Sequence, residues 1–150
     1  MRVKIFEHNS VFYATILKDD KAVNGKRMQS KDLSILNKKI DLYLRTPVNK
    51  RYLFNHYAHD LDYDILSYYC EVWIITEENK NNVVGIEKRG TKNYQIDHII
   101  PIIYGFYNNI DPCIIGGFDN LQIITSIENI KKNTKITPEA EKLLLKYGLL

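Results

Sequence analysis

Short apolar stretches separated by polar turns occupy the beginning of the chain. Val3, Ile5 and then residues 11–17 are rich in the β-branched and aromatic side chains that favour strands. Further along, the pair Asn24-Gly25 is a turn signal. The pattern predicts a small amino-terminal hairpin.

Apolar residues then recur every three or four positions, which is the period of a helix. This pattern begins after Ser30, a good N-cap residue, and Thr46-Pro47 interrupts it. We expect an amphipathic helix between them. Its solvent-exposed side should carry Lys31, Lys38 and Lys39.

Two more helices are predicted before the middle of the chain. One runs from Val48 past Tyr57, and the next runs from about residue 62 to residue 78 with regularly spaced apolar residues. The polar residues 77–82 then predict an exposed loop.

The last third of the chain is expected to contain two strands with a long connection. Residues 94–100 form a short β run that Pro101 ends, because proline cannot donate to a ladder. Residues 102–119 contain Gly, Asn and Pro and predict a long loop, which in a compact domain usually serves function or motion. Residues 121–124 predict the second strand.

Helix signals follow the second strand. Thr125 or Ser126 should cap a helix that has Asn129 in about its first turn. A final short helix is predicted to begin after Thr137, with Pro138 as its first residue.

Composition sets broad limits on the kind of protein. With 150 residues, of which 45% are hydrophobic and 26% charged, the chain suits one compact globular domain. No apolar run approaches the ~20 residues of a membrane helix, and no signal-peptide core follows Met1. Cys70 and Cys113 form no close pair, which argues against a Cys-rich zinc site or a disulfide framework. We therefore expect no membrane partner and a reducing, cytoplasmic location.

Charge is distributed unevenly along the chain. The net charge is +7 over residues 1–51, −6 over residues 52–87 and +2 over residues 88–150. A basic segment can neutralise phosphates and release counterions, which gives non-specific affinity for nucleic acid. An ordinary solvated surface explains the same charges equally well.

Polar residues at the predicted strand ends form a spaced set. Asp97-His98 lies near the end of the first strand, Asn120 precedes the second, and Asn129 falls in the helix after it. The order strand, loop, strand and helix would bring Asp97, His98 and Asn129 together. Because adjacent residues on a regular strand point to opposite faces, Asp97 and His98 can serve one site only where the strand bends or ends.

This set, together with Pro101 and the lysines after Asn129, resembles the HNH endonuclease motif in its variant with Asn in the last place. The resemblance covers roughly residues 88–135. Within this range the chain is similar to small phage and mobile-element HNH nucleases. It implies that Asp97 and Asn129 bind a metal, His98 is the general base and Asn120 holds the loop in the catalytic site. It also implies that the protein works inside a cell, for example in an infected bacterial host.

Phosphodiester hydrolysis needs an activated water and neutralisation of the charge on the phosphate oxygens. An imidazole with a pKa near ~6.5 suits the first task. One carboxylate and one amide oxygen suit a hard cation, so we expect one Mg²⁺ or Mn²⁺ per active site. Many members of the family carry a structural zinc held by two Cys pairs, which this chain cannot build.

Five basic residues are candidates for contacts with the nucleic-acid backbone: Lys88, Arg89, Lys131, Lys132 and Lys135. For the pair before the first motif strand, a solvated turn is an equally good interpretation. An acidic cluster, Asp60-x-Asp62-x-Asp64, resembles a calcium loop, but Ile65 stands where such a loop needs Gly.

Taken together, the sequence predicts an α+β protein with a ββα-metal nuclease core at residues 88–137. Residues 1–87 should form a hairpin and helices that support the fold and contact DNA, and residues 138–150 a last helix, all in one compact unit. The expected activity is metal-dependent DNA hydrolysis. Two alternatives stay open: a nucleic-acid-binding module without chemistry, and a subunit that works only with a larger phage packaging or recombination protein. A homodimer also stays open.

Overall fold

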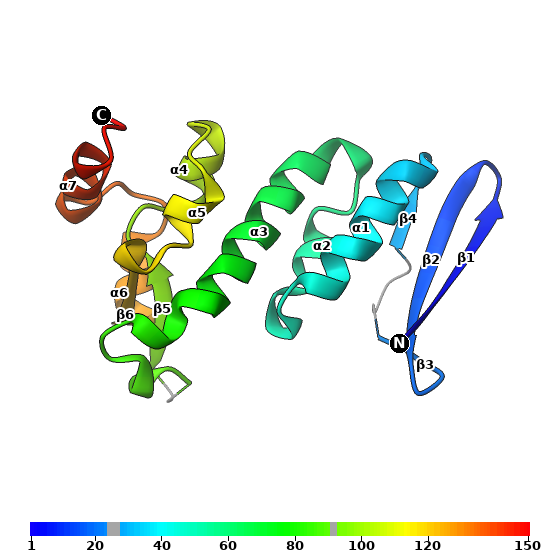
Figure 1. Cartoon of the computed structure of the whole chain (residues 1–150), viewed down its shortest axis with the longest axis horizontal. Helices are drawn as coiled ribbons and strands as arrows, with labels where there is room; N and C mark the ends of the chain where they lie inside the picture. Colours follow the sequence, from blue (N-terminus) through cyan, green and yellow to red (C-terminus); the bar gives the residue numbers. More distant parts are fainter. Residues whose placement is uncertain (24–27, 91–92) are drawn as a thin grey trace. The chain divides into compact units, whose positions relative to one another are not determined.

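The computed structural model describes residues 1–23, 28–90 and 93–150, and these form a mixture of helices and small sheets (Figure 1). This confirms the α+β class. The chain divides into two compact units, Met1–Cys70 and Glu71–Leu150. The division falls within α3 (Tyr63–Asn79), whereas the sequence analysis placed its boundary after residue 87 and expected one compact unit.

The predicted amino-terminal hairpin is present in the first unit. Strands β1 (Arg2–His8) and β2 (Val11–Lys18) pair in antiparallel fashion. Asn9 and Ser10 turn between them with φ of 51° and 58°, as a two-residue hairpin turn of type I′ requires. The short strands β3 (Lys21–Ala22) and β4 (Met28–Ser30) also pair with β2. The predicted turn Asn24-Gly25 lies outside the described residues.

Helix α1 (Leu33–Arg45) corresponds to the first predicted helix, but its N-cap is Asp32 rather than Ser30. The Asp32 carboxylate accepts hydrogen bonds from the amides of Ser34 and Ile35. The Ser30 hydroxyl instead donates to the Asp60 carboxylate at 2.9 Å. A serine near a helix start thus serves a tertiary contact here.

The second predicted helix is broken into short turns. They are η1 (Val48–Lys50), α2 (Leu53–His56) and η2 (Asp60–Asp62). Hydrogen bonds between residues three apart, such as that from the Lys50 amide to the Pro47 carbonyl, close the first turn as a 3-10 helix. At Tyr57 the backbone leaves helical geometry, with φ of −108° and ψ of 58°. The prediction of one helix past Tyr57 was wrong.

The core of the first unit lies between α1 and the sheet (Figure 1). Alternation along β2 points Ala14 and Ile16 to the same face, and both are fully buried. Phe12 and Phe54 pack against the cluster at its edge. Its buried members are Ala14, Ile16, Met28, Leu36, Ile40 and Tyr43.

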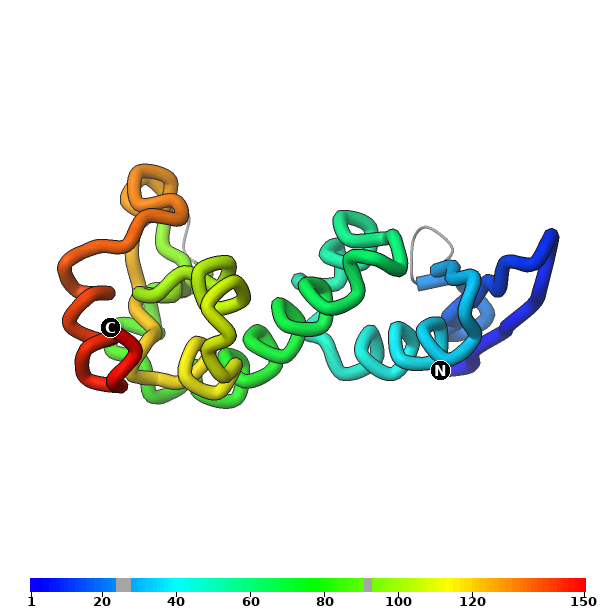
Figure 2. Tube along the Cα trace, turned by 90° about the horizontal axis from the view of Figure 1, so that it is seen from above, coloured from blue at the N-terminus to red at the C-terminus, as the bar shows by residue number. Residues whose placement is uncertain are grey.

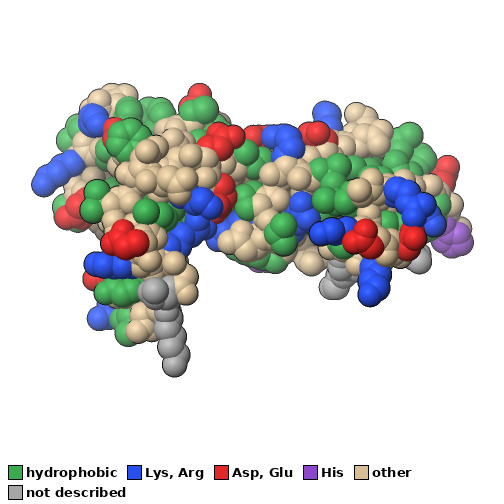
Figure 3. All heavy atoms as spheres, turned by 60° about the horizontal axis from the view of Figure 1, so that its bottom comes forward, with side chains coloured by type: hydrophobic (Ala, Val, Ile, Leu, Met, Phe, Trp, Pro, Cys, Tyr) green, Lys and Arg blue, Asp and Glu red, His purple; other side chains and the backbone are tan. Residues whose placement is uncertain are grey.

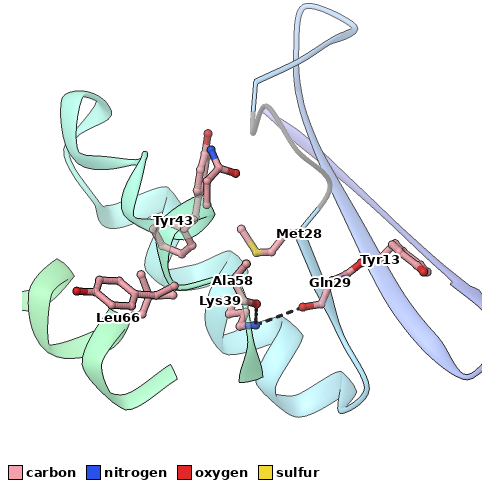
Figure 4. A pocket seen from close by; sticks show the side chains of 10 residues that line it. Tyr13, Met28, Gln29, Lys39, Tyr43, Ala58 and Leu66 are labelled. Atoms are coloured by element: carbon pink, nitrogen blue, oxygen red, sulfur yellow. Dashed lines mark hydrogen bonds between the residues drawn. The ribbon is translucent and has the colours of Figure 1, made fainter. Parts of the chain in front are cut away.

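Lys39 is buried, although the sequence analysis placed it on the exposed side of the helix. Its side chain is 2% exposed. The ammonium donates to the carbonyl oxygens of Gln29 at 3.2 Å and Ala58 at 2.9 Å (Figure 4). It also donates to the Asp60 carboxylate at 2.8 Å. Since these acceptors use the three ammonium protons, burial leaves none of them unsatisfied.

Asp60 makes the stability of this unit depend on pH. Partial burial by itself would raise the pKa of the Asp60 carboxyl, but hydrogen bonds from Lys39, Ser30 and the Lys31 amide outweigh burial and lower it. Because the pKa is lower in the folded state, the stabilisation is complete above the unfolded value of about 3.9. It is lost as the pH falls through the folded pKa.

We therefore expect the stability difference between wild type and Asp60→Asn to shrink as the pH falls below about 4. Amide hydrogen exchange in α1, measured from pH 6 downward, gives this difference. The exposed Asp64→Asn variant is the control. A difference that stays constant with pH would refute the role of Asp60.

In the second unit, two predicted strands pair across a helical connection. Strands β5 (Tyr94–His98) and β6 (Leu121–Thr125) are antiparallel. The predicted loop between them was wrong, because it folds as α4 (Ile102–Tyr107), α5 (Pro112–Ile115) and η5 (Phe118–Asn120). The Asp111 carboxylate caps α5, which has Pro112 in its first turn.

Helical segments precede and follow this strand pair along the chain. The carboxy-terminal part of α3 precedes it, followed by η3 (Lys80–Asn82) and η4 (Ile86–Lys88). The prediction that an exposed loop begins at residue 77 was wrong, since α3 continues to Asn79. After β6 come α6 (Ser126–Lys132) and α7 (Pro138–Lys146), coloured orange and red in Figure 2. Thr137 caps α7 as predicted.

Candidate active site

The carboxy-terminal end of β5 and the start of β6 form the framework of the site. Asp97 lies opposite Gln122, and His98, the last residue of β5, lies opposite Leu121. Helix α6 follows β6 directly and contacts both strands. A capping box between Thr125 and Glu128 fixes the start of α6, because each side chain bonds the backbone of the other residue. Two paired strands and one helix are thus held together locally.

Asp97 is nearly buried and has two polar partners. Its side chain accepts a hydrogen bond from the Gln122 amide at 2.8 Å. The Lys132 ammonium lies 3.1 Å from the same carboxylate and donates to the His98 carbonyl at 2.6 Å. The exposed fractions of the Lys132 and Asp97 side chains are only 9% and 8%. A well-shielded ion pair therefore joins the end of β5 to α6.

Asn129 lies on the same side of α6 as this ion pair. It precedes Lys132 by three residues, so the two side chains are neighbours on one helix face. Asn129 is partly exposed. Since Lys132 contacts Asp97, the face of α6 that carries Asn129 is turned toward the end of β5.

His98 faces a different element. The residue is 5% exposed, and its Nε2 lies 2.8 Å from the Thr76 hydroxyl of α3. The Trp73 ring meets it edge-on, with 4.9 Å between ring centroids. Asp97 and His98 therefore lie on opposite faces of β5, as alternation along a strand requires. The structure brings Asp97 and Lys132 together, but His98 points toward α3.

Asn120 holds the connection between the strands. It is fully buried, and its side-chain oxygen accepts from the Ile100 amide at 2.7 Å. Its side-chain nitrogen donates to the carbonyls of Ile100 at 3.2 Å and Ile115 at 2.7 Å. One side chain thus ties the segment after β5 to the segment before β6.

The basic residues before β5 differ in their surroundings. Arg89 forms an ion pair with Glu77 at 2.6 Å, and Lys80 pairs with the same carboxylate at 2.6 Å. Partial burial would raise the pKa of Glu77, but Arg89 and Lys80 lower it overall, which keeps Glu77 charged. Lys88 is exposed, and its ammonium lies 5.6 Å from the centre of the Tyr94 ring.

Of the three candidate lysines after Asn129, Lys131 and Lys135 are exposed, unlike Lys132. Positive charge available to a phosphate backbone near α6 therefore comes from Lys131 and Lys135. On the face of the molecule in Figure 3, Lys and Arg side chains are interspersed with Asp and Glu. No field of a single sign covers the described part of that face.

Sequence reasoning missed two partners of the candidate residues. Gln122 is the polar residue of an otherwise apolar start to β6, and strand pairing places it opposite Asp97. Thr76 lies in an apolar run of α3 and bonds His98. An isolated polar residue within each apolar run was the available signal, but its partner depends on the tertiary fold.

The Asp97 carboxylate is the candidate metal ligand whose surroundings the structure shows, and both of its polar neighbours are hydrogen-bond donors. A carboxylate offers about four lone-pair positions, and the two donors described above occupy only part of them. The sequence predicts the Asn129 amide as a second, neutral oxygen ligand. Among residues 1–23, 28–90 and 93–150, no group of three or more His, Cys, Asp or Glu side chains could hold a metal. A site here would therefore rest on one carboxylate, amide oxygens and water, which suits Mg²⁺ or Mn²⁺.

A separate hollow lies in the first unit. It has a volume of about 490 Å³ and is lined by aromatic and apolar side chains, including Tyr43 and Met28, beside buried Lys39 (Figure 4). None of the candidate site residues lines it.

Comparison with known proteins does not assign a family. No family model matches the chain, and no match is found among curated proteins or solved structures. Over the described ranges, every helix is too short or too polar to cross a membrane.

Proposed function

We propose that the chain is a metal-dependent endonuclease of the HNH, ββα-metal type that hydrolyses DNA phosphodiester bonds. The main support is the arrangement of β5, β6 and α6. The Asp97 carboxylate at the end of β5 faces the side of α6 that carries Asn129 and Lys132. The Asn120 side chain bonds Ile100, just after β5, and Ile115, in α5, and so holds the connection between β5 and β6 in place.

Each side chain has a defined task in this proposal. Asp97 and Asn129 hold one Mg²⁺ or Mn²⁺, which when bound offsets negative charge on the phosphate and the leaving oxygen. His98, at the end of β5, accepts a proton from the attacking water. Lys132 pairs with Asp97 and holds α6 against the end of β5, while the exposed Lys131 and Lys135 provide positive charge for the phosphate. Asn120 keeps the strand ends in place.

Cleavage of supercoiled plasmid tests the proposal. We expect wild type to nick or linearise the plasmid with Mg²⁺ or Mn²⁺ but not with EDTA. Loss of a general base should reduce the rate by about 10²–10⁴-fold in His98→Ala. The exposed His59 provides a matched control, since His59→Ala should cleave like wild type.

Folding of each variant is checked by thermal unfolding, because His98 is buried. Cleavage that survives in folded His98→Ala would exclude His98 as the base. Absence of cleavage by folded wild type with either metal would refute an autonomous nuclease.

A second candidate function is nucleic-acid binding without chemistry, either alone or as a subunit of a larger assembly. The observation that favours it is the placement of His98, which is buried against α3 on the face of β5 opposite Asp97. The ion pair between Lys132 and Asp97 likewise leaves the carboxylate already neutralised. Activity that appears only with a partner protein would distinguish the subunit from the binding module.

DNA binding gives a prediction that both candidates share. Replacing exposed Lys131 with Ala removes one phosphate contact, so the slope of log affinity against log salt should become shallower by about 0.9 for duplex DNA. Fluorescence anisotropy at several salt concentrations measures this slope. Lys142→Ala, on α7, is the control. Equal slopes for wild type and Lys131→Ala would show that α6 does not contact the backbone.

A further inference from the structure

The Thr76 hydroxyl lies between two polar groups. Its oxygen is 2.7 Å from the Val72 carbonyl oxygen one turn earlier in α3, and 2.8 Å from His98 Nε2. Thr76 is fully buried and His98 is 5% exposed. Both contacts are therefore shielded from solvent.

The first of these contacts fixes the role of the hydroxyl in the second. A backbone carbonyl can only accept, so the Thr76 hydroxyl proton must point to Val72. The hydroxyl oxygen can then only accept from the imidazole, which requires a hydrogen on Nε2. In a neutral imidazole with its proton on Nε2, the lone pair lies on Nδ1.

We propose that Thr76 is a positioning residue that holds His98 in the Nε2–H tautomer and so makes Nδ1 the basic atom of the ring. The inference rests on the proposed nuclease function for its catalytic meaning. Thr76 does not touch the reacting atoms. It selects which ring nitrogen can accept the proton of the attacking water. The Trp73 ring, edge-on at 4.9 Å, restricts rotation of the same imidazole.

Two substitutions separate the hydroxyl from the shape of the side chain. Thr76→Ser keeps a hydroxyl, whereas Thr76→Val has nearly the same shape and cannot accept a hydrogen bond. The Val72 carbonyl keeps its ordinary helical partner, the residue 76 amide, in both variants. Thr46 provides a matched control, because its buried hydroxyl donates to the Leu42 carbonyl at 2.7 Å in α1.

The tautomer is measured directly in the full-length protein by long-range proton–nitrogen correlation of the ¹⁵N-labelled histidine rings at pH 8. At that pH an ordinary imidazole, with a pKa of about 6.5, is neutral. His98 is assigned among the four histidines by the signals that disappear in His98→Asn. We expect the Nε2–H form in wild type, Thr76→Ser and Thr46→Val. In Thr76→Val the ratio should move about tenfold toward Nδ1–H, because one buried hydrogen bond is lost.

An Nδ1–H ring in wild type, or unchanged His98 signals in Thr76→Val, would overturn the assignment. Plasmid cleavage tests its catalytic consequence: kcat should fall about twofold in Thr76→Val with KM unchanged, because a tenfold shift of ratio from a mostly Nε2–H ring removes about half of the reactive tautomer, and Thr76→Ser should restore it. Wild-type cleavage that Thr76→Val does not slow would refute the positioning role. If wild type does not cleave at all, the nuclease proposal fails while the ring signals still decide the tautomer.

Discussion

Replacing Lys39 with methionine is expected to destabilise the first unit by about 3–5 kcal/mol. Methionine retains most of the apolar stem but removes the ammonium. The Asp60 carboxylate then loses its ion pair, and the carbonyls of Gln29 and Ala58 lose their donor. These groups come from β4 and from the chain around η2, so the substitution weakens the attachment of both to α1.

Amide hydrogen exchange in α1 measures this effect as a faster opening of the first unit. Lys38→Met changes an exposed lysine next in the sequence and should leave exchange within about twofold of wild type, since exposed charges contribute little. A double-mutant cycle with Asp60→Asn isolates the ion pair from the other contacts. If Lys39→Met and Lys38→Met had equal effects, the buried ammonium would contribute nothing specific.

Replacing Asn120 with alanine is expected to destabilise the second unit by about 3 kcal/mol, since a buried amide loses its acceptor and two carbonyls lose their donor. The substitution also leaves space in a fully buried position. Pairing of β5 with β6 should weaken, because Asn120 is the last residue before β6.

Urea unfolding followed through the fluorescence of Trp73, the single tryptophan, reports on this unit. The control is Asn108→Ala, whose exposed side chain bonds the Tyr104 carbonyl within its own helix segment. We expect that variant to lose less than about 1 kcal/mol. Similar losses for both variants would mean that Asn120 acts only as an ordinary surface amide does.

Periodicity predicted the elements that have one apolar face and clear ends. The hairpin, α1, α3, β5 and β6 follow from alternation or helical spacing in their own residues. Helices α4 and α5 did not, because both are short and the Asn108-Asn109 and Gly116-Gly117 pairs beside them resemble a loop. Asp111-Pro112 was nevertheless a local signal for the start of α5.

Burial of polar groups was the part that residue type could not predict. Lys39 resembles its exposed neighbours in sequence, and its acceptors lie up to 21 residues away. The opposite orientation of Asp97 and His98 follows from the strand period alone. The strand period does not predict which group His98 contacts, because Thr76 is 22 residues away in the sequence and reaches His98 only through the packing of α3.

The hydrogen bonds of Asn120 influence where residues could be inserted into the second unit. Closing a longer loop costs only about 0.6 kcal/mol for each doubling, so the connection is tolerant of added residues once both of its ends are held. Asn120 holds those ends at Ile100 and Ile115. Between α4 and α5, Asn108 and Asn109 are exposed, and Asn109 already has a positive φ of 52°. This turn is therefore where an insertion would disturb the register of β5 and β6 least.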